Sequence, residues 1–244
     1  MALLGTLARL LSDVHLSPFN MAHNSVRQRA ARCVSLLEEQ YGIPRAEERA
    51  PVDLLVMTIL SQNTSDTNSL RAFARLKSTF SDYERVLAAA DEAVAESIRA
   101  GGLAEIKARR IKEALFRIKR DAGAISLSFL ADMQKEKAMA YLLSLPGVGP
   151  KTASVVLLFA FSMPFLPVDT HVYRVCHRLG LLDEAVALEK AQSILERVVA
   201  VDKYLSFHLN LITHGRRVCR ARNPRHEECA LRDCCDYYLH GQKP

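Results

Sequence analysis

Lys151 stands in a setting that could make its amine a nucleophile. It follows the Gly-Val-Gly stretch 147–149 and Pro150, and the apolar helical pattern before them ends at Leu145. Proline fits the first turn of a helix because it has no N–H to satisfy there. A lysine in that turn lies at the positive end of the helix dipole, which lowers the pKa of the amine and favours its neutral, nucleophilic form. The alternative is a solvated lysine, or one that contacts a phosphate.

The glycines before this lysine predict a helix–hairpin–helix. Gly147 and Gly149 permit backbone angles that are closed to other residues, and they let the backbone approach a ligand closely. The N–H groups of Gly147, Val148 and Gly149 precede a helix, where they suit a DNA phosphate. A tight turn between two helices, without a ligand, is the simpler alternative.

Asp169 is the carboxylate that could assist this lysine. It precedes an apolar helical pattern that begins at Val172, so it fits the N-cap of a helix. It could also point at Lys151. The two interpretations are compatible, because a cap is a rigid way to fix a carboxylate.

The cysteines predict a metal site. Four of the six lie between Cys219 and Cys235. A secreted disulfide scaffold would spread its cysteines through a short chain, so the clustering favours a metal site in a reducing compartment.

Helical periodicity runs through most of the chain, and strand-like alternation is short and isolated. An all-α fold is therefore expected. The segment 54–60 is apolar nearly all round and predicts a buried helix, and Ser81 with Glu84 could form a capping box for a short helix. The other helices are expected near residues 26–41, 92–99, 103–121, 134–144, 151–162, 170–180, 187–200 and 203–216.

The bulk composition allows a nucleic-acid partner without requiring one. Lys and Arg exceed Asp and Glu by 33 to 27, a formal net charge of +6, and phosphate neutralisation is one use of such an excess. No apolar run of about 18 residues predicts a membrane span. The apolar N-terminus carries Arg9 and Asp13, so it does not fit a secretory signal. An extra helix, a loose extension or a start at Met21 all remain open.

Residues 145–153 together with 168–172 resemble the helix–hairpin–helix plus Gly/Pro/Asp signature of the endonuclease III superfamily of DNA glycosylases. The spacing between Lys151 and Asp169 is similar to that of endonuclease III itself. The resemblance implies that Lys151 is the nucleophile and that Asp169 assists it. Relatives that cut only the glycosidic bond lack a lysine at this position, the adenine–mispair branch among them.

Two further segments extend the resemblance. The segment 60–66 resembles the one whose glutamine fills the hole left in the duplex, which implies that role for Gln62. Gly102 and Leu103, followed by Lys107, resemble the loop whose apolar residue wedges between bases. From the residues alone, Gln62 could be a solvated cap and Leu103 a core residue.

The resemblance also implies a 4Fe–4S cluster, whose ligands in endonuclease III follow the spacing C-x6-C-x2-C-x5-C. Placed on this chain, the spacing selects Cys219, His226, Cys229 and Cys235. Histidine can replace a cysteine ligand and raises the potential. Three outcomes remain open: His226 completes the cluster, Cys234 replaces it, or the Cys3His set holds zinc.

Arginines surround the first of these cysteines. In the family, the loop between the first two ligands leans on the DNA backbone, which implies a phosphate clamp. A solvated basic patch is the alternative. The arginines are Arg216, Arg217, Arg220, Arg222 and Arg225.

The resemblance implies a bilobal helix–hairpin–helix DNA glycosylase fold. A six-helix barrel domain would span residues 44–163 and carry the hairpin. Residues 25–43 and 164–244 would form a helical iron–sulfur-cluster domain, and residues 1–24 an N-terminal extension.

The implied function is base-excision repair: a DNA glycosylase with abasic-site lyase activity by β-elimination, acting on oxidised pyrimidines in double-stranded DNA. The target nucleotide must leave the base stack to be reached. A thymine or uracil mismatch glycosylase and a non-catalytic helix–hairpin–helix DNA-binding protein are the alternatives. We expect a cytoplasmic monomer with no membrane partner.

Overall fold

The computed structural model describes residues 18–241, and every regular element among them is a helix, which confirms the all-α expectation. The longer helices are α1 (Pro18–Tyr41), α2 (Pro51–Ser61), α3 (Asp66–Thr79), α6 (Ala104–Ala122), α7 (Lys135–Ser144), α8 (Pro150–Phe161), α9 (Thr170–Arg178), α10 (Leu188–Val198) and α11 (Tyr204–Arg217). The shorter helices are α4 (Tyr83–Ala88), α5 (Asp91–Ser97) and α12 (Asp236–Leu239). The 3-10 turns are η1 (Arg99–Gly101), η2 (Ser128–Asp132), η3 (Val201–Lys203), η4 (His226–Glu228) and η5 (Arg232–Cys234).

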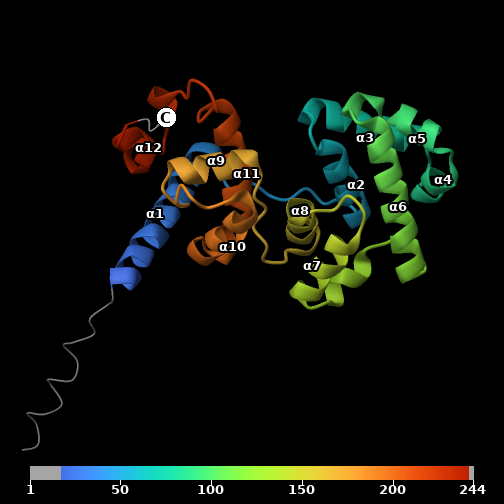
Figure 1. Cartoon of the computed structure of the whole chain (residues 1–244), viewed down its shortest axis with the longest axis horizontal. Coiled ribbons are helices and arrows are strands. Elements are labelled where there is room, and N and C mark those ends of the chain that lie inside the picture. The colour runs from blue at the N-terminus through green and yellow to red at the C-terminus, as the bar shows by residue number, and fades with distance from the viewer. Residues whose placement is uncertain (1–17, 242–244) are drawn as a thin grey trace, which may run out of the picture.

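The helices form two lobes (Figure 1). The central lobe contains α2 to α8, and the terminal lobe contains α1 together with α9 to α12. Each lobe has a hydrophobic core of its own. Residues 42–50 and 162–169 run between the lobes. The cap of α9 at Asp169, the last residue of the second connection, therefore lies at the junction of the lobes.

Helix α2 lies in the interior of the central lobe because its side chains are apolar nearly all round. It packs against α3 and α8, and its burial confirms the expectation for residues 54–60. The buried residues are Val52, Leu54, Leu55, Val56, Thr58, Ile59 and Leu60. A rigid helix of this kind fixes the position of the loop that follows Ser61.

Helix α1 packs against α10 and α11 in the terminal lobe. Its buried face is formed by Ala30, Cys33, Val34 and Leu37. The helix begins at Pro18, earlier than the expected position near residue 26, so Met21 lies within it. Residues 1–17 of the expected extension, with Met1, lie outside the described residues.

The capping box expected for α4 is wrong, because the helix begins one residue later than that motif requires. Asp82 is the N-cap, and its Oδ1 accepts a hydrogen bond from the N–H of Arg85 at 2.8 Å. The hydroxyl of Ser81 donates to Asp82 instead of capping the helix. A carboxylate accepts such a bond more strongly than a hydroxyl does.

The expected hairpin joins α7 to α8, with one difference from the sequence interpretation. Gly147 has φ +75, and an added Cβ would lie 2.7 Å from Cδ of Arg110, so both the backbone angle and the close packing require glycine. Gly149 has φ −100 and ψ 177, which any residue can adopt. No atom lies within 4 Å of a Cβ placed there. The backbone is therefore open to a ligand at Gly149.

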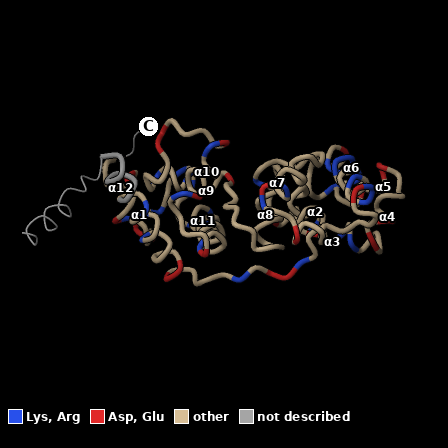
Figure 2. Tube along the Cα trace, turned by 90° about the horizontal axis from the view of Figure 1, so that it is seen from below, with Lys and Arg blue, Asp and Glu red and all other residues tan. Residues whose placement is uncertain are grey.

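Charged residues are distributed along the chain in both lobes, as the coloured Cα trace of Figure 2 shows. Lys and Arg are frequent along α6, where they account for seven of the residues between Ala104 and Ala122. Among the described residues, no helix is long and apolar enough to cross a membrane.

Candidate active site

Lys151 is the second residue of α8 and follows the hairpin directly. The pKa of its amine is lowered, chiefly by burial and to a smaller extent by the charge of Arg216. Asp169 and Asp66 act in the opposite direction and raise it. The sequence interpretation attributed the low pKa to the helix dipole, whereas burial is the largest cause. The net effect has the expected direction: the pKa of the amine is lowered.

Asp169 lies close enough to Lys151 for their charges to interact. It is the N-cap of α9, and its Oδ1 accepts hydrogen bonds from the N–H groups of His171 at 2.9 Å and Val172 at 2.8 Å. Because one oxygen accepts both bonds, Oδ2 is not needed for the cap. The helix thus fixes the carboxylate through one oxygen and leaves the other oxygen free of the cap.

His208 on α11 lies behind this pair and was not singled out from the sequence. It is buried, and its Nδ1 donates to the carbonyl of Pro167 at 2.9 Å. Burial lowers its pKa to about 4, although Asp169 opposes the shift. A neutral imidazole therefore fixes the backbone two residues before Asp169. A single histidine in an apolar helical pattern gives no signal for this role.

An ion pair joins the lobes beside Lys151. Arg216 near the end of α11 is bonded through both terminal nitrogens to the carboxylate of Asp66, the first residue of α3. Both residues influence the pKa of Lys151. Arg216, proposed from the sequence as a phosphate contact, is therefore paired within the protein, and a phosphate would have to compete with Asp66 for it.

Gln62 is attached to the hairpin and is not a solvated cap. It is the C-cap of α2. Its Nε2 donates to the carbonyl of Gly147 at 3.0 Å, and its Oε1 accepts a long bond of 3.5 Å from Arg110. The structure thus brings Gln62 to the hairpin, whose residues Val148 and Gly149 shortly precede Lys151 in the chain.

Leu103 is not a core residue, so the alternative interpretation of its sequence position is wrong. Half of its surface is exposed, and its backbone is in the left-handed region at φ +51. It directly precedes α6. An exposed leucine in a backbone conformation that costs energy agrees with a functional position better than with a packing role.

The four residues selected as metal ligands lie around one small pocket. Cys219, His226, Cys229 and Cys235 all line it, with Arg178 and Tyr237 among their neighbours. Burial raises the pKa of Cys229 to about 11. A buried thiol of this kind needs a bound cation to become a thiolate ligand. Among residues 18–241, no three such side chains are drawn close enough together to hold an ion.

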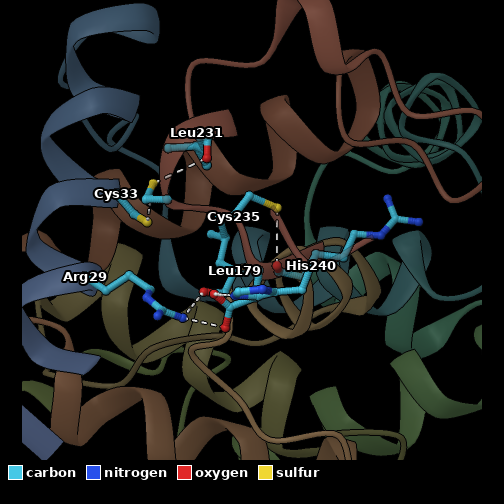
Figure 3. Close-up of polar contacts among 9 residues, drawn as sticks. Arg29, Cys33, Leu179, Leu231, Cys235 and His240 are labelled. Carbon is cyan, nitrogen blue, oxygen red and sulfur yellow. Dashed lines mark hydrogen bonds and ion pairs between the residues drawn. The ribbon is translucent and has the colours of Figure 1, made fainter. Parts of the chain in front are cut away.

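Cys234 is directed away from that pocket. Its Sγ lies 3.6 Å from Sγ of Cys33 on α1, and it donates to the carbonyl of Leu231 at 3.3 Å. Cys235, by contrast, lines the pocket and donates to the carbonyl of Arg178 at 3.2 Å (Figure 3). The placement of the side chains therefore favours His226 over Cys234 as the companion of the three cysteines.

Two arginines of α9 hold the loop after Cys219. Arg178 donates to the carbonyls of Arg220 and Ala221, and to Sγ of Cys219 at 3.2 Å. Arg174 donates to the carbonyl of Cys219. Neither was predicted from the sequence, because the arginines of α9 and the loop are far apart along the chain.

The arginines proposed as phosphate contacts differ in their surroundings. All of them are exposed. Arg225 is paired with Glu228 at 3.1 Å. Arg220 and Arg222 form no ion pair with any residue between 18 and 241, and they lie in a loop whose backbone is held by Arg178. They are therefore well placed to meet a phosphate.

The comparison with known proteins decides the family. Residues 56–200, which include the hairpin, Lys151 and Asp169, match the HhH-GPD superfamily of base excision DNA repair proteins. The chain belongs to this superfamily.

Relatives named endonuclease III match most of the chain. Endonuclease III of Sulfolobus acidocaldarius is 35% identical over 218 residues, which cover 85% of this chain and 95% of that protein. Endonuclease III of Escherichia coli K12 is 33% identical over 189 residues, or 77% and 84% of the two chains. A solved structure described as a trapped endonuclease III–DNA covalent intermediate has a TM-score of 0.72 at 28% identity and covers 86% of this chain and 95% of its own. The chain is thus a base-excision-repair DNA glycosylase and lyase of the HhH-GPD superfamily, and DNA is its partner.

Proposed function

We propose that this glycosylase removes oxidised or ring-saturated pyrimidines from duplex DNA and cleaves the abasic strand through Lys151. The observation that carries the proposal is the pair formed by Lys151 and Asp169. Burial lowers the pKa of the amine, and a helix cap fixes the carboxylate beside it. The choice of base is the one that the resemblance to endonuclease III implies.

The neutral amine of Lys151 attacks C1′ of a nucleotide that has left the stack. An Nζ–C1′ bond forms and the glycosidic bond breaks, with its electron pair leaving on the base. Asp169 assists in two ways. It accepts the proton that the amine releases, and its negative charge stabilises the positive charge that develops on the sugar.

Opening of the sugar ring then gives a Schiff base between Lys151 and C1′. A proton leaves C2′, the C3′–O bond breaks, and the electron pair departs with the 3′ phosphate. The strand is thereby cut on the 3′ side by β-elimination. Hydrolysis of the imine returns the free amine of Lys151.

Three kinds of contact would hold the DNA. The N–H groups of Gly147 and Gly149 suit a phosphate, and the space around Gly149 is open. The N–H of Val148, which the sequence also suggested, already donates to the carbonyl of Leu145 at 3.2 Å. Arg220 and Arg222 would contact phosphates from the terminal lobe. From the central lobe, Gln62 and Leu103 would enter the duplex.

The pocket between Cys219, His226, Cys229 and Cys235 fits a 4Fe–4S cluster by the chemistry of its donors: three sulfurs and one imidazole line the same space. Bound there, the cluster would tie the loop of Arg220 to α12 and so fix a DNA-contacting surface. Arg178, which already donates to Cys219, would stabilise the thiolate.

The deciding experiment is borohydride trapping. The chain is incubated with a duplex that contains an abasic site, and separately with duplexes that contain an oxidised pyrimidine or a thymine or uracil opposite guanine. Covalent trapping on the first two supports the proposal. Excision only of thymine or uracil would assign the mismatch activity instead, and binding without trapping would indicate a non-catalytic DNA-binding protein.

A further inference from the structure

Lys107 is the only lysine among the fully buried large side chains of residues 18–241, with 1% of its surface exposed. It lies in the first turns of α6. Burial lowers the pKa of its amine. Placing an ammonium group in a core costs free energy unless its protons are hydrogen-bonded, so a lysine in this position calls for a specific set of acceptors.

The acceptors are two backbone carbonyls from different segments. Nζ of Lys107 donates to the carbonyl of Leu60 at 2.7 Å and to the carbonyl of Gly101 at 2.8 Å. Leu60 is in the last turn of α2, and Gly101 is the last residue of η1. The carbonyls at the end of a helix lack partners within it and carry the negative end of its dipole. One buried cation therefore satisfies two helix ends at once.

Both helix ends lead directly into the residues proposed to enter the duplex. Two residues after Leu60 is Gln62, and two residues after Gly101 is Leu103. The two segments are 41 residues apart along the chain. The turn η1 packs against α3, α5 and α6, and α2 also packs against α3. In the part of the chain that the structure describes, the amine of Lys107 adds a polar link to this packing, because it donates to a carbonyl of each segment.

We propose that Lys107 is a positioning residue for the opening of the duplex: its ammonium fixes the distance between Gln62 and Leu103, so that both can enter the space around the extruded nucleotide together. The inference rests on the proposed function and adds to it a residue that does not touch the DNA. Gln62 and Leu103 must act at one site, so they need a common rigid support. Even a small displacement of either side chain would strongly slow the opening of the duplex.

The same helix offers a matched control. Lys112, five residues on, donates to the carbonyl of Ala89 at 2.6 Å and pairs with Asp91 at 2.5 Å. It thus also fixes a backbone carbonyl to α6, but at the segment between α4 and α5. Lys112→Met removes the same kind of contact without involving Gln62 or Leu103.

The test compares Lys107→Met with Lys112→Met in the full chain, using trapping rates on an abasic duplex and on a single-stranded abasic oligonucleotide. A nucleotide in a single strand is already unstacked, so no probe has to open a duplex. For Lys107→Met we expect the duplex rate to fall about tenfold, the loss that corresponds to about one hydrogen bond's contribution, and the single-strand rate to stay as in the wild type. Lys112→Met should change neither.

A second measurement observes the opening itself. With 2-aminopurine beside the abasic site, the fluorescence increase on binding should be smaller in Lys107→Met than in Lys112→Met. If the Met variant does not fold, Lys107→Gln is measured in the same way, since its shorter neutral side chain leaves at least one carbonyl without a donor.

Equal losses on duplex and single strand, or equal losses in the two lysine variants, would show that Lys107 only stabilises the fold. The proposed function fails by a different result, namely a wild-type chain that traps neither substrate.

Discussion

Replacing Asp169 by asparagine separates the two roles of this residue. The Oδ1 atom that accepts the N–H groups of His171 and Val172 is present in both side chains, so Asp169→Asn keeps the cap and removes the charge. Asp82→Asn is the matched control. Asp82 caps α4 through the same kind of bond to Arg85, but it is an exposed residue of the central lobe and is not among the residues whose charge shifts the pKa of Lys151.

The size of each effect follows from these contacts. Asparagine and aspartate cap helices almost equally well, so both Asn variants should unfold close to the wild-type temperature. Asp169→Ala removes the acceptor and should cost about 1 kcal/mol, which lowers the melting temperature of a chain of this size by about 3 °C. If Asp169 also accepts a proton in the reaction, Asp169→Asn should slow base excision by about 100- to 10,000-fold.

The pH dependence of trapping gives an independent check of the direction in which Asp169 shifts the pKa of Lys151. Asp169 raises the pKa of Lys151, while burial lowers it. Removing the negative charge therefore lowers the pKa of the lysine further. Trapping on an abasic duplex, from which the base is already missing, requires the neutral amine. The acid limb of the pH–rate profile for trapping should therefore move to lower pH in Asp169→Asn. It should not move in Asp82→Asn.

The assay is single-turnover base excision beside borohydride trapping, with thermal unfolding measured on every variant. Asp169→Asn with a wild-type melting temperature and full excision would reduce Asp169 to a structural cap. An acid limb that moves to higher pH would refute the electrostatic relation between Asp169 and Lys151.

Three further predictions concern single contacts. Lys151→Gln should abolish trapping and strand cleavage while DNA binding by gel shift is retained; trapping at the wild-type rate would assign another amine. Alanine at both Arg220 and Arg222 should weaken binding to damaged and undamaged duplex alike and flatten its salt dependence, whereas a loss confined to damaged DNA would contradict a phosphate role. Anaerobic purification should yield about four irons and four sulfides per chain, retained in Cys234→Ser and reduced in His226→Ala; zinc without sulfide, or iron lost only in the Cys234 variant, would overturn this assignment.

The parts of the site that the sequence predicted are those set by local rules. The hairpin depends on Gly147, which needs a positive φ, and on a proline at the start of α8. The cap at Asp169 depends on the two N–H groups that follow it. Each of these features involves residues within a few positions of one another, so their spacing is visible in the sequence.

The parts that the sequence did not predict depend on contacts between distant segments. His208 reaches the backbone at Pro167, and Arg178 reaches the loop after Cys219, across 41 and 42 residues. No periodicity records such a pairing. Helix α3 was not expected because its buried face consists of Ser69, Ala72 and Leu76, which is a weak apolar pattern.

Local rules also fail at several positions, and three of these positions are connected through Lys107, whereas Ser162 and Asn223, which also have positive φ, lie elsewhere in the chain. A buried lysine, an exposed leucine and two non-glycine residues with positive φ are each unfavourable on their own. The buried lysine is Lys107, and the exposed leucine is Leu103. The two residues with positive φ are Leu103 again, at +51, and Asn63, at +54, which follows Gln62. Lys107 is bonded to the carbonyls just before both turns, so the same contact that satisfies the buried cation supports the two strained turns. A fold selected for stability alone would gain by relaxing these positions, whereas a surface that must enter a base stack needs its side chains held outward on turns that cannot yield.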